Sequence, residues 1–553
     1  MRITWKISTS KIKLFTTAIM IIGFYWFLSY ILLEVWFGKV EEEEEDIIKV
    51  KVPIKMNVSL NYVVMHIDLK RTPLKLSYLE TLLPMLKDNG VNSLLMEYED
   101  MFPYEGKLVN LSAENCYKKL ELKRFISTAI GSGFEIIPMV QTFGHLEYAL
   151  KLSEFQHLRE MPLYPDSICP SKPESMAFIR HLLEQVMDFH NEIRPLKHIH
   201  IGCDEVYHMN ECQNCKKNGL EKTDIFLHQV QTLADVIKSQ YPDTTVLIWD
   251  DMLRGIKPDK WNYIDQFTNV QPVCWDYGAK LIVSHANLFM YHKKFPHIWI
   301  ASAFKGADGR TATFPDPSSR YNNVFSWMDF ISKYRFGGEQ KVYNFRGIIL
   351  TGWSRYSHMD PPCELLPVSI PSLLTSLIVV EKFKSGVSIV IDAYDNKGFE
   401  EELGIGRFVS KKRDCVIEIY NFDYSECEFD GKELYDIFKY FSKISLDLQK
   451  IFNDNERSLE YVEFYSQFDL INKNTLAKNV KILDKNLEKI GFFENTSASV
   501  MSKYYERDFV NEYINYKTFH IKKKLQRLRN IYDMYYNVSV WRRTPINITY
   551  FVT

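Results

Sequence analysis

A regular alternation of strand-like and helix-like segments restricts the fold of this chain more than any other feature. Short runs rich in β-branched and apolar residues alternate with amphipathic stretches of helical periodicity up to about residue 385. Such alternation indicates a parallel sheet, and eight repeats favour a closed (β/α)8 TIM barrel over a doubly wound open sheet, which stays the alternative. The expected strands span residues 63–68, 93–97, 135–140, 198–202, 246–250, 271–275, 298–302 and 347–352, and four expected helices span residues 76–88, 120–131, 174–189 and 224–240.

An apolar segment near the N-terminus predicts a membrane anchor. Residues 14–33 carry no charge, and twenty residues at a helical rise of ~1.5 Å each cover the ~30 Å hydrocarbon core of a bilayer. Basic residues precede this segment and an acidic run at residues 41–46 follows it, so the positive-inside rule leaves the N-terminus in the cytoplasm. A cleaved signal peptide is the alternative, although the apolar run is long for one and no small-residue cleavage pattern follows it.

The chain beyond the expected barrel has a different character. Apolar residues from Leu434 to Ile451 recur at helical spacing, and further helical patterns cover residues 477–490 and 500–536. We expect a helical domain packed on the barrel, with a coiled-coil arm as the alternative, and the oligomeric state stays open. The predicted parts are a cytoplasmic tail (1–13), a transmembrane signal-anchor (14–37), an acidic stem (38–56), the barrel (57–385) and a mostly helical C-terminal domain (386–553).

This organisation predicts a single-pass type II membrane protein. Everything after the anchor is expected in the lumen of the secretory pathway (Golgi-like) or outside the cell. A formal net charge of −2 gives no indication of a nucleic-acid partner. Acceptor sequences for N-glycosylation occur only after the anchor, as expected of a glycoprotein, at Asn57, Asn110, Asn495, Asn537 and Asn547.

Polar and aromatic side chains follow several of the expected strands, where barrel enzymes carry their active sites. The fourth strand stops at Gly202 and is followed by Asp204 and Glu205, a pair suited to acid/base chemistry on a glycosidic bond. The alternative is that Asp204 caps the next helix. Indoles suit the apolar faces of a pyranose ring, and carboxylates accept hydrogen bonds from its hydroxyls, so the set is typical of a sugar cleft. The other strand ends contribute Asp68, His145, Trp249, Trp275, Tyr277, Trp353 and Glu364.

The residues around the acidic pair resemble a known signature. His200, Gly202, Asp204 and Glu205 match the H-x-G-x-D-E pattern of the family 20 β-N-acetylhexosaminidases. Further stretches resemble the hexosaminidase D branch of that family more than its lysosomal branch, and the resemblance covers about residues 60–385. These stretches lie at residues 66–70, 97–104, 141–145, 302–306, 351–356 and 363–367.

The resemblance implies an exo-acting, retaining hydrolase that removes terminal β-linked N-acetylglucosamine or N-acetylgalactosamine from glycans. In this family the substrate's own 2-acetamido group attacks the anomeric carbon and forms an oxazolinium ion. Glu205 is then the general acid and Asp204 orients the acetamide, with no metal or organic cofactor. A carboxylate next to Glu205 is also expected to raise the pKa of that acid. A catalytically silent, membrane-anchored glycan-binding barrel is the alternative.

The remaining candidates are expected to bind the sugar. The resemblance implies that a tyrosine contacts the acetamide oxygen, that tryptophans wall the acetamide pocket, and that an acidic residue after the eighth strand holds sugar hydroxyls. The lysosomal enzymes carry an arginine near the first strand, and no residue here aligns with it. The matching residues are Tyr277 for the first role, Trp249, Trp275 and Trp353 for the second, and Glu364 for the third, with His145 and Asp68 beside them.

Two cysteines lie shortly after the acidic pair. The spacing of Cys212 and Cys215 would suit one half of a zinc site. No second Cys/His pair of suitable spacing accompanies them, so a local disulfide or free thiols are expected instead.

Overall fold

The computed structural model describes residues 53–56, 58–336, 345–390, 405–409, 414–418, 424, 427–454, 464–466, 469–540 and 542. Eight parallel strands close into a barrel in the order β10-β11-β2-β3-β4-β7-β8-β9. The last strand in sequence pairs with the first, with Ile348 opposite Val63, which confirms the predicted barrel and excludes the open sheet. The strands are β2 (Tyr62–Asp68), β3 (Ser93–Glu97), β4 (Glu135–Met139), β7 (His198–His200), β8 (Thr245–Trp249), β9 (Val270–Trp275), β10 (Ile298–Lys305) and β11 (Phe345–Gly352).

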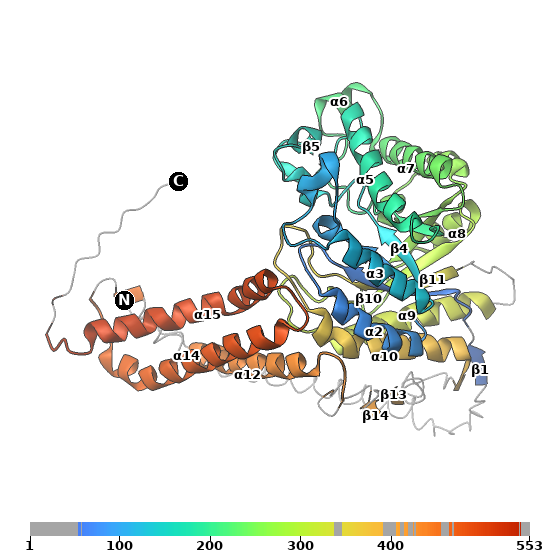
Figure 1. Ribbon diagram of the computed structural model, residues 1–553. Helices are drawn as coiled ribbons and strands as arrows, with labels where there is room; N and C mark the ends of the chain where they lie inside the picture. The colour runs from blue at the N-terminus through green and yellow to red at the C-terminus, as the bar shows by residue number, and fades with distance from the viewer. Residues whose placement is uncertain are drawn as a thin grey trace, which may run out of the picture. The chain divides into compact units, whose positions relative to one another are not determined.

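Helices cover the outside of the barrel (Figure 1). Successive strand residues point to opposite faces, so Val64 faces the interior while its neighbours Val63 and Met65 pack among the residues that join strands to helices. The barrel interior is filled with apolar side chains such as Trp299 and Leu247. The helices are α2 (Leu76–Asp88), α3 (Lys119–Gly131), α5 (Pro173–Asn191), α7 (Lys222–Gln240), α8 (His285–Lys294), α9 (Pro317–Phe336) and α10 (Leu366–Ser385).

Several short elements decorate the loops that follow the strands. An antiparallel hairpin follows β4, and a short helix follows β7. The hairpin was not predicted, because its second strand contains a proline and an aspartate and shows no apolar alternation. These elements are α4 (Glu147–Leu150), β5 (Arg159–Met161), β6 (Tyr164–Ile168), α6 (Gln213–Lys217) and the 3-10 helices η1 (Glu99–Met101), η2 (Gly106–Leu111), η3 (Gln156–Leu158), η4 (Asp251–Leu253) and η5 (Pro258–Gln266).

The C-terminal region is mostly helical, as predicted. The apolar stripe that begins at Leu434 is buried through Leu448, and α14 packs along α15 through Leu483 and Leu528. The predicted helix at residues 500–536 begins later than expected, because α14 runs on to Met501 and the chain turns before α15 starts. The elements are α12 (Lys432–Asp454), α14 (Lys473–Met501), α15 (Arg507–Tyr535), the unpredicted antiparallel pair β13 (Ile405–Val409) and β14 (Asp414–Glu418), and two further strands, β1 (Pro53–Met56) and β12 (Val387–Val390).

Helix α15 is attached to the barrel by both apolar and polar contacts. Tyr505, Phe509 and Tyr513 belong to the same buried cluster as the barrel helices. Lys517 donates hydrogen bonds to the carbonyl of Thr311 at 2.8 Å and to the hydroxyl of Thr313 at 3.1 Å, in the loop after β10. The C-terminal region therefore reaches the end of the barrel at which the strands terminate.

The predicted anchor (14–37) lies outside the described residues, as do the tail and most of the stem. Within the described part, α10 is long and apolar enough to cross a membrane, with a mean hydropathy of 1.4. Of its apolar window, 83% is buried inside the protein, as expected for a helix packed on a barrel.

Candidate active site

A cavity of about 590 Å³ opens where the barrel strands end. The loops after the strands supply its wall, so residues distant in sequence converge there. Most of the predicted site residues line it, whereas Asp68 and Glu364 do not. The lining includes His145, Asp204, Glu205, Trp249, Trp275, Tyr277 and Trp353, together with Lys70, Gln141, Asp308, Arg320, Arg355 and Tyr356, which were not predicted as site residues.

The backbone after β7 positions Asp204. Gly202 and Cys203 have φ angles of 68° and 70°, in the left-handed region. A Cβ atom on Gly202 would lie 1.8 Å from Oε1 of Gln141, so the glycine makes room for that amide. Nε2 of Gln141 in turn donates to Oδ1 of Asp204 at 3.1 Å. Asp204 is therefore not a helix cap, and α6 begins only after Cys212, whose sulfur caps it.

His145 lies between the two acidic side chains. Its Nε2 is 3.5 Å from Oδ2 of Asp204 and 3.4 Å from Oε2 of Glu205. Burial opposes protonation, but the charge of Asp204 and the hydrogen bond to Glu205 outweigh it and raise the pKa of His145 to about 9. The hydrogen bond from His145 lowers the pKa of Glu205, against a smaller opposing effect of burial. The expectation that Asp204 raises the pKa of Glu205 is therefore wrong for this arrangement, because a cationic imidazole sits between them.

Asp251 supports the loop that carries Glu205. Its Oδ2 accepts the backbone N–H of Glu205 at 2.9 Å, and its Oδ1 accepts the indole N–H of Trp275 at 3.2 Å. Burial, with the nearby charge of Asp204, raises the pKa of Asp251 to about 7. Asp250 and Asp251 both follow the fifth strand, and the sequence alone does not distinguish their roles. In the structure, Asp250 binds Arg254 and not the Glu205 loop, with Oδ1 and Nη2 2.6 Å apart.

Indole and phenol rings form another part of the wall. The ring centres of Trp249 and Trp353 are 5.8 Å apart, and Trp275 stacks on Tyr277 at 5.2 Å. The indole N–H of Trp353 donates to the Tyr277 hydroxyl at 3.2 Å. Burial raises the pKa of Tyr277 well above its usual value, so the hydroxyl keeps its proton and can donate it to a carbonyl oxygen.

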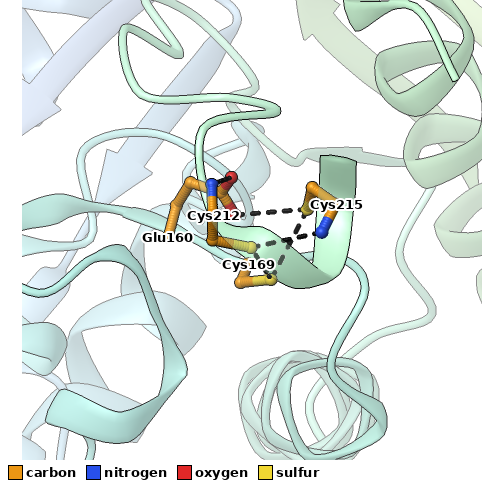
Figure 2. Close-up of side chains that lie close together, drawn as sticks. All are labelled: Glu160, Cys169, Cys212 and Cys215. Carbon is orange, nitrogen blue, oxygen red and sulfur yellow. Dashed lines mark hydrogen bonds between the residues drawn. The ribbon is translucent and has the colours of Figure 1, made fainter. Parts of the chain in front are cut away.

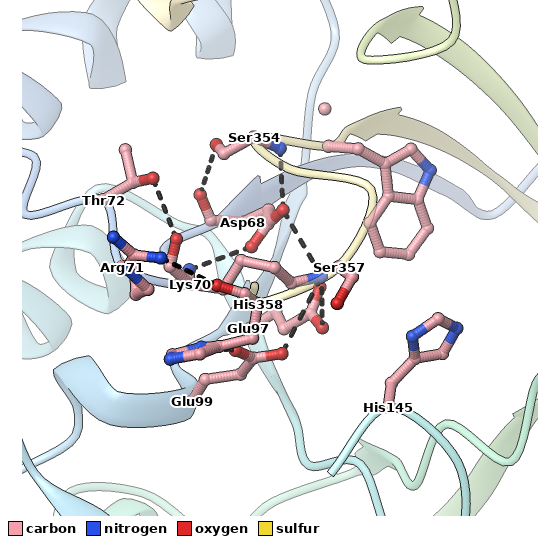
Figure 3. Close-up of polar contacts among 12 residues, drawn as sticks. Asp68, Lys70, Arg71, Thr72, Glu97, Glu99, His145, Ser354, Ser357 and His358 are labelled. Carbon is pink, nitrogen blue, oxygen red and sulfur yellow. Dashed lines mark hydrogen bonds and ion pairs between the residues drawn. The ribbon is translucent and has the colours of Figure 1, made fainter. Parts of the chain in front are cut away.

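Asp68 belongs to a buried polar cluster beside the cavity (Figure 3). Its Oδ2 accepts the backbone N–H of Ser354 at 2.7 Å, so it holds the loop that carries Trp353 and does not form the wall. Lys70 does line the cavity, with its Nζ 3.3 Å from Oε1 of Glu97 and 3.6 Å from Oδ2 of Asp68. Its carboxylate neighbours raise the pKa of Lys70 well above the usual value despite burial, so the lysine is a fixed cation.

Glu364, the residue expected to hold sugar hydroxyls, is buried and is not among the residues that line the cavity. The chain folds back after Trp353, with the Cys363 N–H bonded to the Ser354 carbonyl at 3.0 Å, and this turn buries Glu364 behind the wall. Burial raises the pKa of Glu364. The cationic side chains that line the cavity are Lys70, His145, Arg320 and Arg355. Sequence pattern alone could not separate Glu364 from Lys70 and Arg355, since all three follow the first or the last barrel strand.

Comparisons with known proteins agree on one family. The model of the glycosyl hydrolase family 20 catalytic domain matches residues 77–355. The chain is 40% identical over 319 residues to hexosaminidase D of Bos taurus, covering 56% of this chain and 90% of that protein. It is 39% identical over 321 residues to hexosaminidase D of Homo sapiens, covering 64% of that protein.

Two solved structures show lower similarity to this chain. The β-N-acetylhexosaminidase of Bacteroides fragilis is 16% identical with a TM-score of 0.42, covering 57% of this chain and 65% of that chain. Dispersin B is 13% identical with a TM-score of 0.40, covering 59% of this chain and 98% of that chain.

Proposed function

The chain belongs to glycosyl hydrolase family 20, and from that premise we propose that it is an exo-acting, retaining β-N-acetylhexosaminidase. Its proposed substrates are glycans that end in β-linked N-acetylglucosamine or N-acetylgalactosamine. One observation carries the proposal: Asp204, Glu205 and Tyr277 line a single cavity whose wall contains three indoles. A volume of about 590 Å³ suits a small ligand such as a terminal sugar with its acetamide group.

The first half of the reaction uses the substrate as its own nucleophile. The acetamide carbonyl oxygen attacks the anomeric carbon, and the bond to the leaving oxygen breaks as Glu205 transfers its proton to that oxygen. Asp204, held by Gln141, accepts a hydrogen bond from the acetamide N–H and balances the positive charge of the oxazolinium ring. The protonated hydroxyl of Tyr277 donates to the acetamide oxygen and holds it in the attacking position.

The second half reverses these roles. The Glu205 carboxylate takes a proton from water as the water oxygen bonds to the anomeric carbon, and the oxazolinium ring opens to restore the acetamide. Two displacements at one carbon give net retention.

Glu205 must be protonated when the sugar is bound. The Glu205 side chain is 37% exposed, so a bound leaving group would displace water from it, and burial raises a carboxyl pKa. Occupation of the cavity therefore works against the lowering effect of His145.

Hydrolysis of aryl glycosides tests the proposal. The full-length chain, purified in detergent, would be assayed on aryl β-N-acetylglucosaminide, β-N-acetylgalactosaminide and β-glucoside. We expect cleavage of at least one acetamido sugar and none of the glucoside, which lacks the internal nucleophile, and lower activity in Glu205→Gln. Folded protein that cleaves the glucoside equally well would contradict substrate assistance. Folded protein that binds these sugars without cleaving them would favour the catalytically silent barrel.

We also propose the type II membrane topology, with the barrel in the secretory lumen or outside the cell. Three acceptor asparagines in the described part, Asn110, Asn495 and Asn537, have exposed side chains, and Cys427 is disulfide-bonded, as suits an oxidising compartment. Treatment of the cell-expressed protein with an endoglycosidase should lower its apparent mass. An unchanged mass, together with digestion of the barrel by protease added from the cytoplasmic side, would refute the topology.

A further inference from the structure

Three cysteines and one glutamate lie close together outside the active site (Figure 2). Glu160 lies on β5, Cys169 directly follows β6, and Cys212 and Cys215 lie at the start of α6. The Sγ atom of Cys169 is 3.5 Å from that of Cys212 and 3.6 Å from that of Cys215. Oε2 of Glu160 is 3.3 Å from Sγ of Cys215, and all four donor atoms lie within 4.8 Å of one another.

These separations match the corners of a tetrahedral zinc site. With Zn–S bonds of ~2.3 Å, two sulfur ligands of a tetrahedron are ~3.8 Å apart, and a sulfur and an oxygen ligand are ~3.5 Å apart. Three of the six donor pairs are 3.3 to 3.6 Å apart and the others lie within 4.8 Å, so shifts of about 1 Å or less in the separations would admit the ion. A disulfide would instead require Cys169 and Cys212 to approach to an S–S distance of ~2.05 Å.

Hydrogen bonds around the four residues hold them in place. Oε1 of Glu160 accepts the backbone N–H groups of Glu211 at 2.7 Å and Cys212 at 2.8 Å, which directs Oε2 toward the sulfurs. The backbone N–H of Cys215 donates to Sγ of Cys212 at 3.3 Å, as a thiolate ligand requires. Glu160 is only 1% exposed, and a buried carboxylate among thiols is costly unless a cation neutralises it.

We propose that Glu160, Cys169, Cys212 and Cys215 bind one structural zinc ion. Three sulfurs and one oxygen complete the tetrahedron with protein ligands, which is the arrangement of a structural site and leaves no position for substrate. The expectation of a local disulfide or unliganded thiols overlooked this set, because Cys169 lies 43 residues before Cys212 and the fourth ligand is a glutamate.

The proposed ion joins the β5–β6 hairpin to the segment that runs from Glu205 to α6. The hairpin already contacts that segment through Asp166, whose Oδ2 lies 2.8 Å from Nδ1 of His208, and through Tyr164, which stacks on the same imidazole at 4.2 Å. Zinc would therefore fix the C-terminal side of the loop that carries the general acid, without touching substrate.

Metal analysis of the intact protein tests the site. The full-length chain, purified in detergent without chelators and without a polyhistidine tag, should contain about one zinc ion per chain. Cys215→Ser should lose the metal, whereas Cys116→Ser, which changes a thiol outside the cluster, should keep it. Wild-type protein without zinc, or equal zinc content in both variants, would overturn the proposal.

A second measurement on the wild type does not depend on the folding of any variant. Alkylation followed by mass spectrometry should show Cys169, Cys212 and Cys215 protected until a chelator is added. Cobalt substituted for zinc should give the visible absorption of tetrahedral thiolate coordination. A Cys169–Cys212 disulfide that persists in chelator, or thiols that react fully without one, would overturn the proposal while leaving glycosidase activity as a separate question.

Discussion

Glu512 of α15 forms a two-pronged ion pair with Arg355, with each carboxylate oxygen 3.0 Å from a different guanidinium nitrogen. Arg355 lines the active-site cavity, whereas Glu512 belongs to the C-terminal region, to which the sequence assigned no chemistry. Arg71, in the loop after the first strand, donates to the same carboxylate at 3.0 Å. One side chain of the helical region thus connects the first and the last loops of the barrel.

Neutralising Glu512 should weaken catalysis from outside the cavity. In Glu512→Gln we expect kcat/KM to fall about tenfold, which corresponds to ~1.4 kcal/mol of lost transition-state stabilisation. The expected loss is moderate because a partly exposed ion pair contributes less than a fully buried one. Glu494→Gln is the matched control, since Glu494 of α14 pairs with Lys522 of α15 and neither residue lines the cavity. Equal kcat/KM values for wild type and Glu512→Gln would show that the pair does not position Arg355.

Substitutions in the acidic pair should separate the two proposed roles. Glu205→Gln should lower turnover by about 10²–10⁴-fold on an oligosaccharide, and by less on an aryl glycoside, whose leaving group needs little protonation. Asp204→Asn should slow both substrates to a similar degree, since it acts on the acetamide. Steady-state kinetics with the two substrate types measure the difference. A uniform loss in Glu205→Gln would contradict its assignment as the acid.

His145 should make stability depend on pH. Because the pKa of His145 is raised to about 9, from ~6.5 in the unfolded chain, its contribution is complete below pH ~6.5 and is lost as the pH rises through 9. Relative to His145→Gln, the wild type should gain ~1–3 kcal/mol near pH 6, where the carboxylates that pair with the imidazolium are ionised, and little above pH 9. Melting temperatures across this range, with the exposed-site variant His181→Gln as control, provide the measurement. A pH-independent difference would refute the ion pair.

Gly202 and Gly219 form a natural pair for testing the support of Asp204. Both have positive φ angles, 68° and 64°, so alanine should cost each ~1–2 kcal/mol of stability. A Cβ at Gly202 collides with Gln141, whereas a Cβ at Gly219 meets nothing within 4 Å. Gly202→Ala should therefore lose activity as Gln141 is displaced from Asp204, and Gly219→Ala should not. Similar kcat values in the two folded variants would show that Gln141 does not set the position of Asp204.

Residues that follow strands directly could be predicted, because strand periodicity and the barrel rule place them at one end of the sheet. Asp204, Glu205 and Trp275 are examples, and all three line the cavity. Asp68 also ends a strand, but its carboxylate accepts a hydrogen bond from the backbone N–H of Ser354, 286 residues later in the chain. Glu364 lies twelve residues after the end of β11 at Gly352, and the turn between them determines its position.

Contacts between distant segments could not be read from local pattern. The hairpin β5–β6 lacks apolar alternation, so no local pattern indicated that Cys169 lies near Cys212. The ion pair between Glu512 of α15 and Arg355 could not be predicted for a similar reason. The two residues are 157 positions apart, and neither belongs to a local motif that indicates a partner.

The anchoring of the β10 loop by Lys517 bears on how genetic variation in this chain should be interpreted. A premature stop codon before α15 would leave every barrel strand and both members of the acidic pair encoded. It would nevertheless remove the lysine that holds Thr311 and Thr313, in a loop whose earlier residues Gly306, Ala307 and Asp308 line the cavity. Truncations before α15 and substitutions of Lys517 therefore belong with active-site lesions when variants are classified, although they fall more than a hundred residues beyond the last barrel strand, which ends at Gly352.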